Sequence, residues 1–151
     1  MKIVLALGSN LGDRKSNIDQ AISELEKIIE ITHLSTMHET APVGGPKQGD
    51  YLNSVLIGES ELDPHELLAL TSKIETKLGR VRDVRNGPRT VDIDLIVFGE
   101  LRINTPDLEI PHPRAHEREF VLVPWLEIDP DAQIPGRSSV AKILAELAVS
   151  E

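Results

Sequence analysis

The apolar positions at the start of the chain follow two different periods. Residues 2–7, KIVLAL, form a short apolar run that ends at the turn residues GSNLGD, a pattern typical of a buried strand. Asp13 then stands where a helix N-cap is expected, and apolar residues recur at helical spacing after it (Ile18, Ala21, Ile22, Leu25, Ile28 and Ile29). The pattern predicts a strand followed by a helix over residues 14–29.

Two further strands and a second helix are predicted next. Residues 31–39 and 51–59 have the composition of strands and are separated by TAPVGGPKQGD, a segment rich in glycine and proline. The stretch DPHE carries an N-cap, a proline at the first helical position and a glutamate placed for a capping box (Asp63, Pro64 and Glu66). This second helix is expected to end before Gly79.

A strand near residues 91–98 closes the series. The order β-α-β-β-α-β favours an α+β fold with an antiparallel sheet and its helices on one face, the ferredoxin-like arrangement. Residues 138–148 predict an additional C-terminal helix, capped by Ser138 or Ser139, and a short helix is expected within residues 115–128. The whole region from 100 to 137 carries six of the ten prolines, and outside this short helix it is expected to be irregular.

Length and composition restrict the class of protein. A chain of 151 residues is long enough for one domain, expected over residues 1–151, with a core that needs no disulfide or structural metal. Cysteine is absent, which removes disulfide, zinc–thiolate and cysteine-nucleophile chemistry and fits a cytoplasmic location. The net charge of −9 argues against nucleic-acid binding, and no apolar segment has the length of a membrane span, so we expect no membrane partner.

Two aspartates interrupt the apolar run of the last predicted strand. Side chains alternate along a strand, so Asp92 and Asp94 point to one face and Ile93 to the other. Two carboxylates repel by about 4 kcal/mol at about 4 Å in an effective dielectric constant of about 20, so a partly buried pair requires a cation or a shared proton. A solvated strand edge is the alternative interpretation. The apolar flanks favour magnesium, which one or two carboxylates can hold.

Arginines cluster immediately before these aspartates. Four of the nine fall within ten positions (Arg80, Arg82, Arg85 and Arg89). Guanidinium groups bind phosphate oxygens in a forked geometry, and screening beyond about 10 Å lets a local cluster attract a small anion despite the overall negative charge. An acidic pair beside an arginine cluster indicates magnesium–nucleotide chemistry.

Three other motifs are weaker signals. The stretch GSNLGDRKS is not a P-loop, because Asp13 stands where that motif requires glycine. His112 and His116 have a spacing that can hold a metal on a helix, but no third ligand accompanies them. Tyr51 and Asn53 share one face of a predicted strand, which suits either ordinary packing or a flat heteroaromatic ligand.

Several separate motifs carry a resemblance to a known family. The run RNGPRTVDIDLIVFG, preceded by IETKLGRVR and followed by IPHPRAHEREFVLVPW, resembles the 6-hydroxymethyl-7,8-dihydropterin pyrophosphokinases of folate biosynthesis. LALGSNLGD, TAPVGGPKQGDYLNSV and EIDPDAQIPG also match in order, so the resemblance covers nearly the whole chain. It implies transfer of diphosphate from ATP to the hydroxymethyl group of a reduced pterin, with release of AMP, by a protein that we expect to be a monomer.

The resemblance also implies roles for individual residues. Two Mg²⁺ ions are expected with ATP, held by Asp92 and Asp94, and catalysis is expected to involve these two aspartates with Arg82 and Arg89. The residues implied in ATP binding are Glu75, Arg82, Arg89, Leu95, His112 and Arg118. The residues implied in the pterin site are Thr40, Ala41, Pro42, Val43, Tyr51, Asn53 and Phe120. The segments 40–50 and 80–90, which contain glycine and proline, are expected to close over the substrates.

Two alternatives from the residues themselves stay open. A non-catalytic ferredoxin-like module that binds a small ligand would explain the fold and a polar site, but not an aspartate pair beside arginines. A metal-dependent nucleotidyl transferase would use the same residues. The leaving product separates the three: AMP for a pyrophosphokinase, inorganic pyrophosphate for a nucleotidyl transferase, and none for a binding module.

Overall fold

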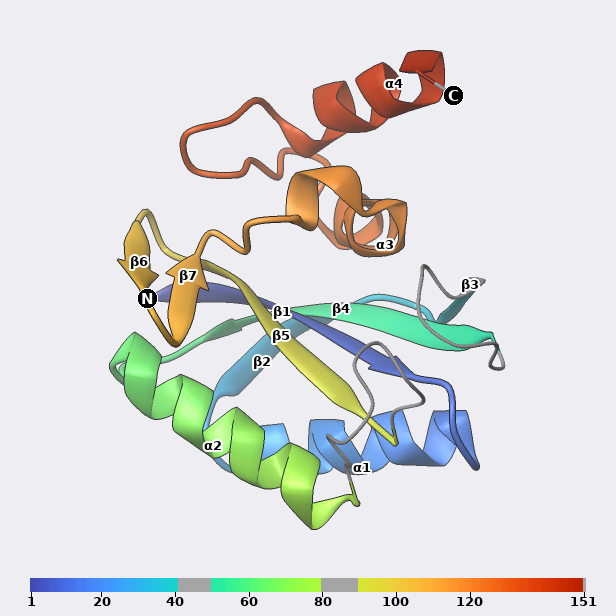
Figure 1. Ribbon diagram of the computed structural model, residues 1–151, viewed down its shortest axis with the longest axis vertical. Helices are drawn as coiled ribbons and strands as arrows, with labels where there is room; N and C mark the ends of the chain where they lie inside the picture. Colours follow the sequence, from blue (N-terminus) through green and yellow to red (C-terminus); the bar gives the residue numbers. More distant parts are fainter. Residues whose placement is uncertain (41–49, 80–89, 151) are drawn as a thin grey trace.

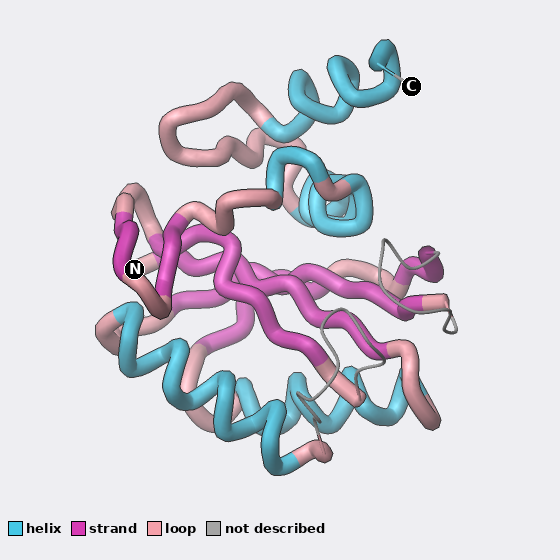
Figure 2. The backbone as a smooth tube through the Cα atoms, viewed as in Figure 1, coloured by secondary structure: helices cyan, strands magenta, loops and turns pink. Residues whose placement is uncertain are grey.

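An antiparallel sheet forms the centre of the computed structural model, which describes residues 1–40, 50–79 and 90–150. Its strands are β1 (Lys2–Ser9), β2 (Glu30–Leu34), β3 (His38–Thr40), β4 (Tyr51–Glu59) and β5 (Asp92–Phe98). The strands are drawn in magenta in Figure 2. Within the described residues their order is β2-β4-β1-β5, and β3 pairs with β4 further along from β2. Each pairing is antiparallel.

Helices cover both faces of this sheet. Figure 1 shows α1 (Arg14–Leu25) and α2 (Pro64–Lys77) on one face, α3 (Glu119–Ile128) on the other, and α4 (Val140–Ser150) beyond α3. A hairpin of β6 (Ile103–Thr105) and β7 (Leu108–Ile110) and a 3₁₀ turn, η1 (Ala115–Glu117), connect β5 to α3. Among the residues placed in the structure, no helix is long and apolar enough to cross a membrane.

The N-cap side chains predicted from the sequence are found at the starts of α1, α2 and α4. Asp13 accepts a hydrogen bond from the Ser16 backbone N–H at 3.1 Å, which begins α1. At α2 the Asp63 carboxylate accepts from a backbone N–H of the first turn, and the Glu66 carboxylate accepts from the Asp63 N–H, so the predicted capping box is confirmed. For α4 the Ser139 hydroxyl oxygen accepts from the Lys142 N–H at 3.2 Å, which selects Ser139 over Ser138 as the cap.

The structure differs from the prediction in a helix end, a strand break and a hairpin. Helix α1 ends at Leu25 rather than near residue 29, because the N–H groups of Lys27 and Ile28 bond three residues back and tighten the chain into turns. The strand predicted over 31–39 is broken at Ser35, whose hydroxyl oxygen takes the hydrogen bond of the Val55 N–H that a ladder carbonyl would accept. The β6–β7 hairpin within 100–137 was not predicted, although Pro106 and Asp107 are ordinary turn residues.

Two apolar cores lie on opposite faces of the sheet. The core beneath α1 and α2 takes Ile3, Leu5 and Leu7 from β1, and the core beneath α3 takes Val4 and Ala6. On β5 the pairing with β1 shifts by one residue, since Leu5 is opposite Leu95 while Val4 is opposite Val97. Ile96 is therefore the extra residue of a β-bulge. The alternation of faces is strict from Asp92 to Leu95, and it positions the aspartates on the α3 face.

Candidate active site

The register of three strands aligns the predicted site residues in rows. Gly8 on β1 is opposite Asn53 on β4 and also opposite Asp92 on β5, and Ala6 is likewise opposite Val55 and Asp94. Directly opposite residues point to the same face of a sheet, here the face that α3 covers. Neighbouring strands are about 4.8 Å apart, so the Cα atoms of Asn53 and Asp92 are separated by roughly 10 Å across Gly8.

Small residues occupy the strand between the amide and the carboxylates. We call Ala6 and Gly8 the small-residue track. A Cβ at position 8 would lie 3.2 Å from Asn53 Oδ1 and 3.5 Å from the Tyr51 ring. The sheet therefore contributes only a methyl group and a hydrogen atom to this track. The sequence offered one signal for it that the motif reasoning did not use, a glycine near the end of an apolar strand run.

The Asn53 amide is held in one orientation by β3. The side chain is 5% exposed, and its Nδ2 donates to the Thr40 hydroxyl oxygen at 2.6 Å and, more weakly, to the His38 carbonyl oxygen at 3.4 Å. Because a carbonyl group can only accept, the amide nitrogen must face β3. The amide oxygen consequently faces the small-residue track, where it can accept a hydrogen bond from an N–H group of a ligand.

The start of α3 brings a cation and an aromatic ring to the aspartates. Both carboxylate residues are half-buried, and Arg118 Nη1 lies 3.7 Å from Asp94 Oδ2. The Arg118 guanidinium also lies over the Phe120 ring, 5.5 Å from its centroid, in cation–π geometry. Arg118, predicted for ATP, thus lies beside Asp94, and Phe120, predicted for the pterin, lies next to Arg118.

Glu75 supports β5 from the opposite helix layer. This α2 side chain is 3% exposed, and its Oε2 accepts a hydrogen bond from the Ile93 N–H at 2.8 Å. The bond is made between the two aspartates, so it fixes the backbone that carries both. Leu95 packs in the core beneath α1 and α2, on the face opposite the aspartate side chains. The roles of Glu75 and Leu95 in ATP binding stay predictions.

His112 is a neutral hydrogen-bond donor beside the aspartates. Its backbone N–H donates to the carbonyl of the bulged Ile96 at 2.9 Å, and its Nδ1 accepts from the Arg114 N–H at 3.2 Å. Burial, followed by the positive charges of Arg118 and Arg114, lowers the pKa of His112 to about 4, against an opposing effect of Asp92. With Nδ1 accepting, the proton of the neutral ring is on Nε2, which can donate to an anionic oxygen.

The structure brings together most of the predicted site residues that it describes. Thr40, Tyr51, Asn53, Asp92, Asp94, His112, Arg118 and Phe120 come from β3, β4, β5, the segment after β7, and the start of α3. Glu75 and Leu95 are described but lie on the other side of β5, the side that α1 and α2 cover. The other predicted residues lie outside the described part of the chain: Ala41, Pro42, Val43, Arg82 and Arg89. Motif reasoning did not identify His38, whose carbonyl oxygen helps to orient Asn53, or the track residues Ala6 and Gly8.

The two carboxylates of the site are oxygen donors of the kind that suits magnesium. Within residues 1–40, 50–79 and 90–150, no group of three or more histidine, cysteine, aspartate or glutamate side chains could hold a metal ion. Magnesium requires only one or two carboxylates and completes its shell with water and substrate phosphate oxygens. Asp92 and Asp94, one strand repeat apart on one face, supply such a pair.

Lowering the pH should destabilise the metal-free protein through His112. The unfolded chain binds a proton on this imidazole below pH 6.5, whereas the folded protein binds it only near pH 4, so falling pH favours unfolding within this window. The free energy of unfolding, measured with urea at a series of pH values, should fall less steeply from pH 6.5 to 4 in His112→Asn, whose amide oxygen can still accept from the Arg114 N–H. Parallel profiles for the two proteins would contradict the assignment.

Sequence comparison identifies the relatives of this chain. The family model of 7,8-dihydro-6-hydroxymethylpterin-pyrophosphokinase (HPPK) matches residues 4–130. A 2-amino-4-hydroxy-6-hydroxymethyldihydropteridine pyrophosphokinase of Bacillus subtilis is 46% identical over 126 residues, which cover 82% of this chain and 75% of that protein. The protein of the same name from Aquifex aeolicus is 41% identical over 133 residues, which cover 88% and 83% of the two chains.

Solved structures of longer proteins share the fold. A crystal structure of HPPK-DHPS in complex with substrates superposes on 99% of this chain with a TM-score of 0.78 at 15% identity, and Plasmodium falciparum HPPK-DHPS with STZ-DHP gives 0.75 at 13%. This chain spans 44% and 41% of those two chains, less than half of each. The family model covers most of the chain and the two relatives are 46% and 41% identical to it, so this protein belongs to the 7,8-dihydro-6-hydroxymethylpterin-pyrophosphokinase family.

Proposed function

We propose that this protein transfers the diphosphoryl group of ATP to the hydroxymethyl group of 6-hydroxymethyl-7,8-dihydropterin and releases AMP, with Mg²⁺ as the cofactor. One observation carries the proposal beyond family membership. The pairing of Gly8 with both Asn53 and Asp92 puts the Asn53 amide, proposed to recognise the pterin ring, and the Asp92 carboxylate, proposed to bind metal, on one face on either side of Gly8. Two substrates that must react with each other can lie side by side on this face.

The pterin is proposed to lie over the small-residue track, on the Asn53 side. The edge of its pyrimidine ring carries N–H donors, and Asn53 Oδ1 is an acceptor that faces the track. Tyr51 lies beside Gly8 and Phe120 lies in the first turn of α3, so we propose that both rings pack against the flat heterocycle. Thr40 acts through its hydrogen bond to Asn53. Ala41, Pro42 and Val43 stay predicted members of this site.

The triphosphate is proposed to lie on the aspartate side. Asp92 and Asp94 would hold Mg²⁺, which neutralises phosphate charge and orients the oxygens of the transferred group. Arg118 and the Nε2–H of His112 can donate to phosphate oxygens beside them. Arg82 and Arg89 stay predicted phosphate ligands. The presence of two ions is part of the proposal, drawn from the family resemblance.

The proposed reaction requires alignment and charge neutralisation more than covalent catalysis. The hydroxymethyl oxygen attacks the β-phosphorus and loses its proton, the bond from that phosphorus to the oxygen of the α-phosphate breaks, and AMP leaves. The residues on the α3 face bind and orient the two reactants, which accelerates such a transfer by removing their relative motion. Either aspartate could accept the proton, and the geometry selects neither.

The strand order supports the finer fold assignment. If β2 and β3 are counted as one strand interrupted at Ser35, the elements follow the order β-α-β-β-α-β, with helices α1 and α2 on one face. We propose on this basis that the sheet is ferredoxin-like, with α3 and α4 added on the other face. The single domain, the monomeric state and the cytoplasmic location stay predictions from the sequence.

The nucleotide product tests the proposed reaction. Incubation of the protein with Mg²⁺, ATP and 6-hydroxymethyl-7,8-dihydropterin should yield AMP and the pterin diphosphate in equal amounts, because the β-phosphorus is the proposed site of attack. Anion-exchange chromatography separates the nucleotides, and a reaction without pterin is the control. Inorganic pyrophosphate as the product would indicate a nucleotidyl transferase, and an unchanged ATP pool would indicate a binding module.

Asp94→Asn should abolish most of the turnover while the protein stays folded. The amide keeps the size of the side chain but removes the charge that would hold Mg²⁺ and that faces Arg118. A misplaced ion should cost at least about 3 kcal/mol of transition-state stabilisation, roughly a hundredfold in rate. Single-turnover kinetics with thermal unfolding as the stability control measure this. Turnover near that of the unsubstituted protein would remove Asp94 from the metal site.

Gly8→Ala should weaken pterin binding without unfolding the protein. The new methyl group would project into the proposed pterin position, where its near contacts are the side chains of Asn53 and Tyr51. We expect the pterin Kd to rise by at least about fivefold, since an overfilled site costs about 1–3 kcal/mol. Gly58→Ala is the matched control: its Cβ would lie 2.7 Å from the Glu30 carbonyl oxygen, so it should lower stability but leave pterin affinity unchanged. An unchanged pterin Kd in Gly8→Ala, with a raised Kd in Gly58→Ala, would show that the pterin binds elsewhere.

A further inference from the structure

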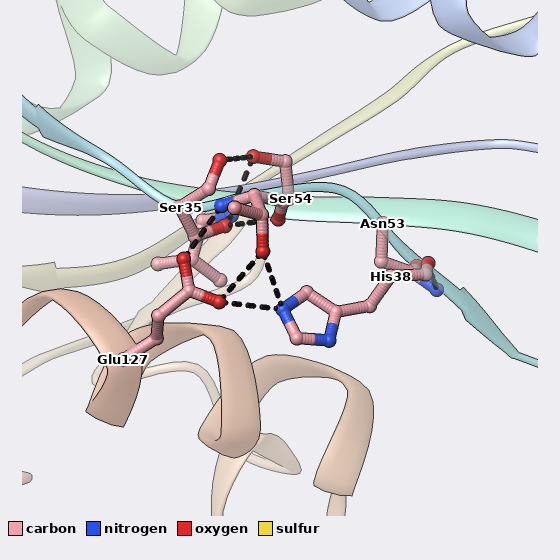
Figure 3. A network of polar contacts seen from close by, with 7 residues as sticks. Ser35, His38, Asn53, Ser54 and Glu127 are labelled. Carbon is pink, nitrogen blue, oxygen red and sulfur yellow. Dashed lines mark hydrogen bonds and ion pairs between the residues drawn. The ribbon is translucent and has the colours of Figure 1, made fainter.

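A carboxylate in the last turn of α3 holds the segment between β2 and β3. Glu127 Oε2 accepts from the Thr36 backbone N–H at 2.7 Å, and Glu127 Oε1 accepts from the Thr36 hydroxyl at 2.8 Å. The same Oε1 lies 2.8 Å from His38 Nε2, as Figure 3 shows. These bonds, first the one from the Thr36 N–H, lower the pKa of the Glu127 carboxyl, so the group is a carboxylate. We call the contacts of Glu127 with Thr36 and His38 the Glu127 brace.

Strand β3 requires support of this kind because it is short. It has three residues, and its one ladder within the described chain is with β4, so it forms few backbone hydrogen bonds. Ser35, the residue before Thr36, is anchored to the sheet. Its N–H donates to the Val55 carbonyl oxygen and its hydroxyl oxygen accepts from the Val55 N–H, both at 2.9 Å. The Glu127 brace adds contacts from the helix layer to the next residues. Its absence would leave β3 attached mainly through its own ladder.

The position of β3 in turn determines the orientation of the Asn53 amide. His38 is directly opposite Asn53, and both hydrogen bonds of Asn53 Nδ2 are to oxygens of β3. The terminal torsion of an asparagine side chain has a broad energy profile, so these partners, rather than the side chain itself, fix its direction. A displaced β3 would release the amide and allow its oxygen to turn away from the small-residue track.

We propose that Glu127 is a positioning residue for pterin binding: it holds β3 through Thr36 and His38, and β3 holds the Asn53 oxygen towards the pterin. The inference rests on the proposed function, because it requires the pterin to bind at Asn53. Glu127 itself contacts no substrate in this arrangement. If the brace only stabilised the fold, its loss would lower the affinities for ATP and for the pterin alike. If it positions Asn53, its loss lowers the affinity for the pterin alone.

The experiment compares the two ligands in two substitutions of Glu127, with 6-hydroxymethyl-7,8-dihydropterin as the pterin. Glu127→Ala should raise both the Kd and the KM for this pterin by about fivefold to tenfold, with the Kd for Mg-ATP changed by less than about twofold, as is typical when a supporting network is interrupted. Glu127→Gln keeps an oxygen for the Thr36 N–H and an amide that can bond to the Thr36 hydroxyl or to His38. It should therefore restore pterin affinity to within about twofold of the unsubstituted protein.

Two further variants separate the brace from general loosening of α3. Lys2→Ala removes the 3.2 Å ion pair between Lys2 and Asp129, which ties the same end of α3 to β1, and should leave pterin affinity unchanged. His38→Ala removes one contact of the brace and keeps the backbone carbonyl, so we expect a smaller rise in pterin Kd. In the double variant with Glu127→Ala, the rise should be no larger than for Glu127→Ala alone, because both changes act through one network.

Two results would overturn the proposal. One is an unchanged pterin Kd in Glu127→Ala, and the other is an equal loss of pterin and ATP affinity. Thermal unfolding shows whether each variant is folded at the temperature of the titration. If Glu127→Ala is unfolded at that temperature, the test uses His38→Ala instead. An unchanged pterin Kd in His38→Ala then overturns the proposal. If the unsubstituted protein does not bind the pterin, the proposed function is overturned as well. If it binds the pterin and the variants have the same pterin Kd, only the positioning role of Glu127 is rejected.

Discussion

The register of β1 between β4 and β5 is the constraint on which the site depends. Gly8 has Asn53 as its neighbour on one side and Asp92 on the other, and Ala6 has Val55 and Asp94. A slip of one residue in either ladder would turn the amide or the carboxylates to the opposite face. The apolar side chains of β5 oppose a slip of its ladder, because it would exchange Ile93 and Leu95, which are buried beneath α1 and α2, for Asp92 and Asp94. The burial of ordinary aliphatic residues thus determines where the polar groups meet.

Helix α3 then fixes what lies above those rows. Val121, Leu122 and Trp125 bury its centre against the sheet, an interaction that is strong but has little directional preference. Its ends are polar: Arg118 lies near Asp94 at the start, and Glu127 bonds to Thr36 and His38 in the last turn. A helix of ten residues is about 15 Å long, enough to reach from β5 to β3 across the face. The apolar centre supplies affinity for the sheet, and the two ends set the position.

Local patterns predicted the parts of this structure that local interactions determine. The caps at Asp13 and Asp63 act within one turn, and the shared face of Asp92 and Asp94 follows from strand geometry. The break at Ser35 was not predictable in this way, because its cause is a bond to Val55, 20 residues further on. The contacts of Glu127 with Thr36 and His38 join residues 91 and 89 positions apart. For the candidate site, strand alternation and motifs identified the carboxylates and the amide. The small-residue track became evident only from the strand register, and the support of β3 only from the contacts of Glu127.

The distance along the chain between β3 and α3 has a consequence for protein synthesis. A nascent chain that has emerged through β5 contains every strand of the central sheet, yet the face with Asn53 and the two aspartates still lacks its cover, including Val121, Leu122 and Trp125. Val4, Val55 and Ile57 on that face would be open to solvent or to a chaperone until residue 128 leaves the ribosome. Folding on the ribosome therefore completes the candidate site late, and a ribosome that stalls between β5 and α3 would display an aggregation-prone sheet that lacks its helical cover.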